Sequence, residues 1–145
     1  MMRARTLILF ILFALTLSPS AGNAQTAQQI RTMLDATTKS WIAFREYNGA
    51  QLIYFTQFVT MKCALKEVRF SLNSPSLEHT FELPKCNWEA PFNVDAKKLP
   101  YISMALGTAK SISVQVTYSD GSKSRIYTYR PCNVDPGTSC AKLIE

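Results

Sequence analysis

Four cysteines and a single histidine are the residues of this sequence best suited to chemistry. They are Cys63, Cys86, Cys132, Cys140 and His79. Thiols and an imidazole can ligate a metal or form a nucleophilic pair, and thiols can also form disulfides. The cysteines are 23, 46 and 8 residues apart, with no Cys-x-x-Cys pair, and one imidazole adds little to them. The spacing therefore disfavours a zinc site, and we predict neither a metal nor a cofactor.

Signatures of common catalytic sites are missing from the sequence. It contains no Gly-rich phosphate loop, no Gly-x-Ser-x-Gly and no His-Glu-x-x-His. Glu78 with Glu82 and Glu89 with Asp95 are close enough in sequence for paired acid and base work, but their pattern is that of ordinary exposed acids. A nucleophilic pair with His79 would need a thiol that stays free. We therefore expect that the protein is not an enzyme.

The N-terminal segment has the pattern of a secretory signal peptide. Arg3 and Arg5 precede an apolar stretch at 7–17, and Gly22-Asn23-Ala24 supplies small residues for cleavage before Gln25. The apolar stretch is well short of the ~20 residues that span a bilayer, so an uncleaved anchor is the less favoured alternative. We predict a signal peptide at 1–24, no stable membrane span after cleavage, and one β-rich domain at 25–145 in the periplasm or outside the cell.

Export changes what the cysteines mean, because an oxidising compartment converts an even number of thiols into disulfides. Four cysteines allow three pairings. We favour Cys63–Cys86 with Cys132–Cys140, since each encloses a short span, although the sequence alone leaves the other pairings open. The second bridge would close the turn-rich segment 133–139.

The charge of the chain is moderately positive. Lys and Arg number 16 against 10 Asp and Glu, and losing the two arginines of 1–24 lowers the formal net charge from +6 to +4. The remaining cations are spread along the sequence and include Lys62, Lys66, Arg69, Lys85, Lys97, Lys98, Lys110, Lys123, Arg125, Arg130 and Lys142. This spread predicts a solvated surface with a mild attraction for anionic partners and no nucleic-acid groove.

The elements that must position these residues are mostly strands. Apolar residues at helical spacing predict one short amphipathic helix over 26–38. Asn48-Gly49 predicts a hairpin between a strand at 41–46 and a long one at 51–63, whose two faces are both apolar. Further strands are predicted at 66–73, 80–83, 101–106, 111–118 and 125–130, with a long loop at 84–100.

The order of these elements predicts a mainly β fold. We expect an antiparallel β-sandwich of the immunoglobulin-like class, with one short N-terminal amphipathic helix after the signal peptide. A small barrel is the alternative.

Aromatic residues are the remaining candidates for a binding surface. Trp88 lies in the long loop, and Tyr54, Tyr127 and Tyr129 lie on predicted strands whose two faces cannot all be buried. The alternative is that these rings cover core edges. We expect a non-catalytic interaction module that binds a protein or an anionic cell-envelope polymer. A small apolar-ligand carrier, or an inhibitor that inserts loop 84–100 or 132–140 into an enzyme, are the alternatives.

Overall fold

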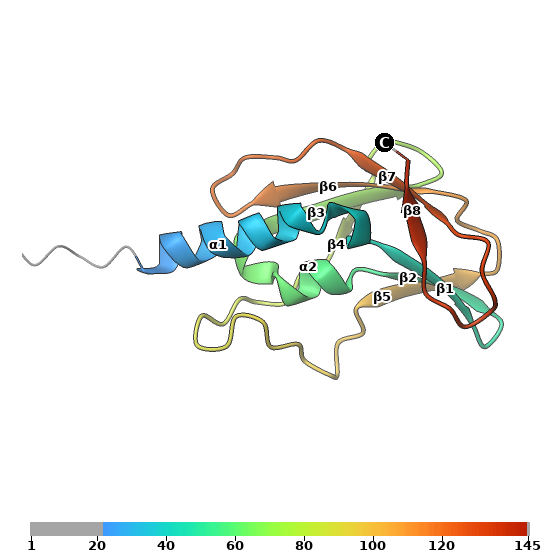
Figure 1. Cartoon of the computed structure of the whole chain (residues 1–145), viewed down its shortest axis with the longest axis horizontal. Helices are drawn as coiled ribbons and strands as arrows, with labels where there is room; N and C mark the ends of the chain where they lie inside the picture. Colours follow the sequence, from blue (N-terminus) through green and yellow to red (C-terminus); the bar gives the residue numbers. More distant parts are fainter. Residues whose placement is uncertain (1–21, 145) are drawn as a thin grey trace, which may run out of the picture.

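The computed structural model describes residues 22–144, which form a mainly β fold (Figure 1). Residues 1–21 of the predicted signal peptide at 1–24 lie outside the described residues, and Gly22-Asn23-Ala24 of its predicted cleavage site form the start of helix α1 (Gly22–Ala36). Within 22–144, none of the helices combines the length and the apolar character needed to cross a bilayer.

Within these described residues, eight strands form two antiparallel sheets. The larger sheet has the order β4-β3-β6-β7-β8 and contains β3 (Leu65–Leu72), β4 (His79–Phe81), β6 (Ile112–Tyr118), β7 (Tyr127–Pro131) and β8 (Ala141–Leu143). The smaller sheet has the order β1-β2-β5 and contains β1 (Ala43–Tyr47), β2 (Ala50–Tyr54) and β5 (Tyr101–Ala105). The mainly β, antiparallel class is confirmed, and two sheets are consistent with a sandwich.

The helical elements lie near the core side of the larger sheet (Figure 1). They are the α-helices α1 (Gly22–Ala36) and α2 (Thr56–Thr60) and the 3₁₀ turns η1 (Thr38–Ser40) and η2 (Lys62–Ala64). Ile30 and Leu34 are one helical turn apart on α1, and both are buried in the core. The helix thus adds an apolar stripe to a core built mainly by strands.

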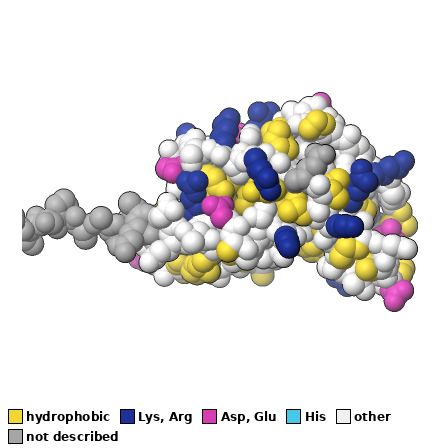
Figure 2. Space-filling model, turned by 45° about the horizontal axis from the view of Figure 1, so that its top comes forward, with side chains coloured by type: hydrophobic (Ala, Val, Ile, Leu, Met, Phe, Trp, Pro, Cys, Tyr) yellow, Lys and Arg dark blue, Asp and Glu magenta, His cyan; other side chains and the backbone are white. Residues whose placement is uncertain are grey.

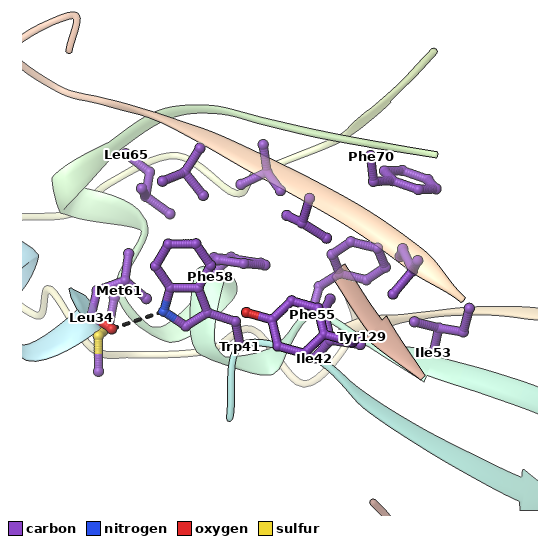
Figure 3. Packing of buried hydrophobic residues seen from close by; sticks show 14 of the residues in the cluster. Leu34, Trp41, Ile42, Ile53, Phe55, Phe58, Met61, Leu65, Phe70 and Tyr129 are labelled. Carbon is purple, nitrogen blue, oxygen red and sulfur yellow. Dashed lines mark hydrogen bonds between the residues drawn. The ribbon is translucent and has the colours of Figure 1, made fainter. Parts of the chain in front are cut away.

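The centre of the core is aromatic (Figure 3). The Trp41 ring meets Phe58 edge-on at 5.3 Å between ring centroids, and its indole N–H donates to the Leu34 carbonyl at 2.8 Å. Phe55 stacks on Phe81 of β4 at 4.2 Å. Phe55 directly follows β2 of the smaller sheet, and Phe81 lies on β4 at the edge of the larger sheet. These stacked rings therefore connect both sheets to a single core.

The prediction of one long strand over 51–63 is wrong. β2 ends at Tyr54, and the chain then turns through α2 and η2. The reason is packing, because Phe55, Phe58 and Val59 have i, i+3, i+4 spacing and are all buried. A strand would place Phe55 and Phe58 on opposite faces, whereas one helical turn buries both.

Local turn chemistry explains the hairpin between β1 and β2. Asn48 and Gly49 have φ of 51° and 76°, the left-handed backbone that this dipeptide accepts in two-residue hairpin loops. On β3, Ser71 is buried, and its hydroxyl accepts the Glu78 N–H at 2.7 Å. The chain after β3 folds back over this position and shields it from solvent.

A disulfide loop joins the two sheets. Phe44 of β1 exchanges two backbone hydrogen bonds with Cys140, at 3.0 and 2.9 Å, just before β8 begins. The Arg45 side chain donates to the Gly137 carbonyl, and the Gly137 N–H donates to the Glu46 carbonyl, both at 2.8 Å. The segment 132–140 therefore covers the outer edge of β1.

Candidate functional site

The structure pairs Cys63 with Cys86 and Cys132 with Cys140, the connectivity that the sequence favours. Among residues 22–144, no cysteine has a free thiol. His79 is exposed at the start of β4, where its ring lies 5.3 Å from that of Phe70. No cluster of three His, Cys, Asp or Glu side chains in the described part of the chain has the arrangement of a metal site.

The four aromatic candidates do not converge on one surface. Tyr54 lies opposite Tyr101 on the smaller sheet, with ring centroids 5.1 Å apart. Tyr127 is half-buried on β7, where it meets Trp41 edge-on at 5.0 Å. Trp88 is 38% exposed on the long loop. The fold distributes these rings over the two sheets and a loop, so they do not form one aromatic binding site.

Tyr129 is a core residue and not part of an exposed surface. Its side chain is fully buried, and its hydroxyl donates to the Thr38 carbonyl at 2.7 Å. Burial raises the pKa of this phenol, because the charged form would lose its hydration. The residue therefore ties β7 to η1, which is the core role that the sequence left open as the alternative.

The loop that carries Trp88 exposes an apolar surface. Trp88, Phe92 and Leu99 are 38%, 44% and 61% exposed. The Cys63–Cys86 disulfide holds one end of this loop, and the buried Lys62 ammonium donates to the carbonyls of Pro91 and Asn93 at 3.1 and 2.7 Å. Burial also lowers the pKa of Lys62. The loop backbone is thus anchored while three large apolar side chains face outwards.

The face of the larger sheet that points away from the core is polar; Ser71 and Ser113 on it are buried, whereas its cations Arg130 and Lys142 are exposed. Cross-strand partners point to the same side of a sheet, and the register pairs Ser71 with Ser113, Ser113 with Thr128, and Arg130 with Lys142. The larger sheet lies at the top of Figure 1, and Figure 2 turns that side forward. Lys and Arg side chains recur across this view, with fewer Asp and Glu between them.

Two adjoining hollows of ≈ 180 and ≈ 450 Å³ form a groove at one end of this face. Both are lined by Asn73, Ser111 and Arg130, and together they add Ser74, Pro75, Lys110, Ser113, Thr128 and Ile144. We call this the Lys110–Arg130 groove. The Asn73 side chain shapes it by accepting the N–H groups of Lys110 and Ser111, at 2.8 and 3.2 Å. Among the described residues, none with a carboxylate side chain lines the groove.

The two cations of the groove form no ion pair with any residue of the described part of the chain. The ion pairs between described residues are Arg31–Asp35, Arg31–Asp120 and Lys98–Glu82, and none involves Lys110 or Arg130. Both side chains are exposed. Their positive potential is therefore directed at solvent, and an anion can approach without displacing a carboxylate of residues 22–144.

Two other surface hollows have mixed charge. One of ≈ 580 Å³ is lined by Lys66, Lys123, Glu67 and Glu82 among others, and one of ≈ 160 Å³ lies against the 132–140 loop with Arg45, Glu46 and Asp135. Acids beside the bases make both less suited to an anion. Neither is an enclosed apolar cavity of the kind that a carrier would use.

The sequence did not predict the Lys110–Arg130 groove. Its two cations are 20 residues apart in the sequence, and the β6–β7 pairing brings them to the same groove. Comparison with models of known protein families, with characterised proteins and with solved structures finds no match for this chain. Its function is therefore argued from its own surface.

Proposed function

We propose that the protein is an exported, non-catalytic module that binds an anionic cell-envelope polymer through the Lys110–Arg130 groove. The observation that carries this proposal is a pair of exposed cations that form no ion pair with a described residue, in a groove where no described residue supplies a carboxylate. Two disulfides are compatible with an oxidising, exported environment. Membership of the immunoglobulin-like class is part of the same proposal and stays a prediction.

The groove offers the contacts that a carboxylate or phosphate group needs. The Arg130 guanidinium can donate two parallel hydrogen bonds to such a group, and Lys110 adds a mobile point charge. The Ser111 hydroxyl can donate or accept beside them. Because the groove is open and shallow, it suits successive charged units of a chain better than an enclosed small molecule.

A protein partner is the second candidate, and its site would be the anchored loop with Trp88, Phe92 and Leu99. Exposed aromatic and aliphatic side chains on a held backbone are typical of protein contact surfaces. We rank the anionic polymer first. The charges of Lys110 and Arg130, which are unpaired among the described residues, indicate that the ligand is an anion, whereas exposed apolar area indicates only that a ligand is partly apolar.

The experiment measures binding of the oxidised, exported protein to polygalacturonate, with dextran as the uncharged control polymer. The matched variants are Lys110→Ala/Arg130→Ala in the groove and Lys39→Ala/Lys97→Ala, which removes two exposed cations elsewhere. We expect the groove variant to bind at least about tenfold more weakly, since charged hydrogen bonds contribute about 1.5 kcal/mol or more each. The control pair should change binding much less.

Equal losses in both double variants would show that only net charge matters and would contradict a groove site. Polyphosphate replaces polygalacturonate in a second arm and shows whether phosphate or carboxylate is preferred. Duplex DNA forms a third arm, where we expect weak binding that both variants reduce equally. Binding that the Trp88→Ala variant abolishes and the groove variant leaves intact would favour the loop instead.

A further inference from the structure

We infer that the outer edge of β5 pairs with β5 of a second copy of this chain, so that two smaller sheets join into one antiparallel six-stranded sheet. β5 is the outermost strand of its sheet and pairs with β2 alone. In an antiparallel ladder, alternate residues direct their N–H and C=O groups away from the neighbouring strand. Among the described residues, the Ala105 carbonyl accepts the N–H and the hydroxyl of Thr108, at 3.2 and 2.7 Å, and no other hydrogen bond outside the β2 ladder reaches the β5 backbone.

The other strand edges are short, charged or covered, whereas on β5 a turn covers only the last carbonyl, that of Ala105. β4 and β8 have three residues each, and β8 carries Lys142 at its centre. The outer edge of β1 is covered by segment 132–140. β5 has five residues, Tyr-Ile-Ser-Met-Ala, with no charge and no proline, and its register with β2 is continuous. Proteins usually protect exposed edges with charges, prolines or bulges, so an unprotected edge indicates a pairing site.

The sequence of β5 is complementary to itself. Antiparallel pairing about a two-fold axis at Ser103 places Ile102 opposite Met104 of the second copy and Tyr101 opposite its Ala105. The two Ser103 residues then face each other at the axis, where small side chains fit. Ile102 and Met104 are already partly buried against the core and would gain apolar cover from the added strand.

The residues that flank the strand add exposed apolar surface next to it. Leu99 and Leu106 are 61% and 51% exposed, among the most exposed large apolar side chains of the described chain. Leu106 directly follows β5, and Leu99 lies two residues before it. A second copy paired with β5 would reduce the exposure of both leucines.

The first experiment measures the molar mass of the exported, oxidised protein by sedimentation velocity over a range of concentrations. We expect a monomer–dimer equilibrium in the wild type and at least about tenfold weaker association in Ser103→Lys, where two charges would meet at the axis. Thr80→Lys is the control, because it adds the same charge to an exposed residue of the other edge strand, β4. Far-ultraviolet circular dichroism and thermal melting show that each variant is folded.

A second experiment tests the register. Ser103→Cys should give a disulfide-linked dimer on mild oxidation, because the two Ser103 residues are direct cross-strand partners. Ala105→Cys should not, since the two Ala105 positions would lie about 14 Å apart along the paired strands. A wild type that stays monomeric up to about 1 mM, or a dimer that Ser103→Lys does not weaken, would overturn the inference. Equal cross-linking of both cysteine variants would overturn the register and with it the two-fold pairing at Ser103.

Discussion

Tyr129 shows how a single polar atom is accommodated in an aromatic core. Its ring fills a central position, and its hydroxyl reaches the Thr38 carbonyl of η1. Burial raises the pKa of this phenol above its ordinary value of 10.0, so the hydroxyl stays protonated and can donate the hydrogen bond. Tyr129 therefore contributes to the core, connects β7 to η1 by a hydrogen bond, and should make the stability of the fold sensitive to high pH.

We predict that Tyr129→Phe lowers the free energy of unfolding at neutral pH by about 1 kcal/mol, because the buried Thr38 carbonyl loses its donor. The contribution of Tyr129 to wild-type stability should be constant below pH 10. It should be lost as pH rises through the raised pKa of the folded state, because the unfolded chain then binds fewer protons than the native one. In Tyr129→Phe this alkaline decline should be smaller. Urea unfolding at several pH values measures both effects.

Tyr127→Phe is the control for this prediction, since Tyr127 lies two residues away and its hydroxyl makes no hydrogen bond to a described residue. We expect it to change stability by less than Tyr129→Phe. An alkaline profile of Tyr129→Phe that coincides with the wild type would contradict the role assigned to the buried phenol.

The long loop 82–100 is an element that has hardly any regular structure and depends on two anchors. The Cys63–Cys86 disulfide fixes its start, and Lys62 holds its middle through two carbonyls. Lys62 is only 5% exposed and has no ion pair with a described residue. A buried ammonium without a counter-ion is costly, so its role as a backbone donor explains its position.

We predict that Lys62→Met keeps the packing volume but lowers the free energy of unfolding by about 1–3 kcal/mol, because two backbone carbonyls lose a charged donor. The loop should become more mobile, and proteolysis within 87–97 should become faster. Lys66→Met is the control, because Lys66 is exposed and lies four residues away on β3. Unchanged proteolysis of the loop in Lys62→Met would show that the disulfide alone is a sufficient anchor.

Elements could be predicted from the sequence where local pattern and packing agree. The alternation in 111–118 and the Asn48-Gly49 turn correspond to β6 and the β1–β2 hairpin. The segment after Tyr54 could not be predicted as a strand, because its apolar residues also fit a helical turn and only tertiary packing selects it. β8 was missed, since a strand of three residues carries no period and is formed by pairing with β7.

At the scale of the whole molecule, contacts between distant parts of the described chain join the two sheets. The Phe44–Cys140 pair joins β1 near the start of the described chain to the segment before β8 near its end. The Cys132–Cys140 disulfide restrains the same segment, whose Gly137 bonds to β1 through both its N–H and its C=O. This loop is therefore the point where the two sheets are joined at their edges.

We predict that Cys132→Ala/Cys140→Ala lowers the free energy of unfolding by about 2–3 kcal/mol, by the loop entropy of a short bridge. Amide exchange should accelerate at Phe44 and Gly137, because the released segment no longer stays on β1. Cys63→Ala/Cys86→Ala is the control and should leave these two amides protected. Slow exchange at Phe44 in both variants would mean that backbone pairing joins the sheets without the disulfide.

The candidate groove also depends on the tertiary fold, so the sequence did not reveal it. Lys110 and Arg130 become neighbours only when β6 and β7 pair and Asn73 holds the turn before β6. The sequence showed cations that were evenly spread, and the topology collected some of them on one face. The disulfides were easier to anticipate, because consecutive pairing needs only short spans.

The two disulfides do not interleave: Cys63 pairs with the next cysteine along the chain, and so does Cys132. A chain that enters an oxidising space N-terminus first presents each cysteine with its native partner before any later thiol has arrived. Oxidation in order of appearance therefore produces the native connectivity directly. Such a chain can mature with an oxidant alone, without an enzyme that reshuffles wrongly paired bridges.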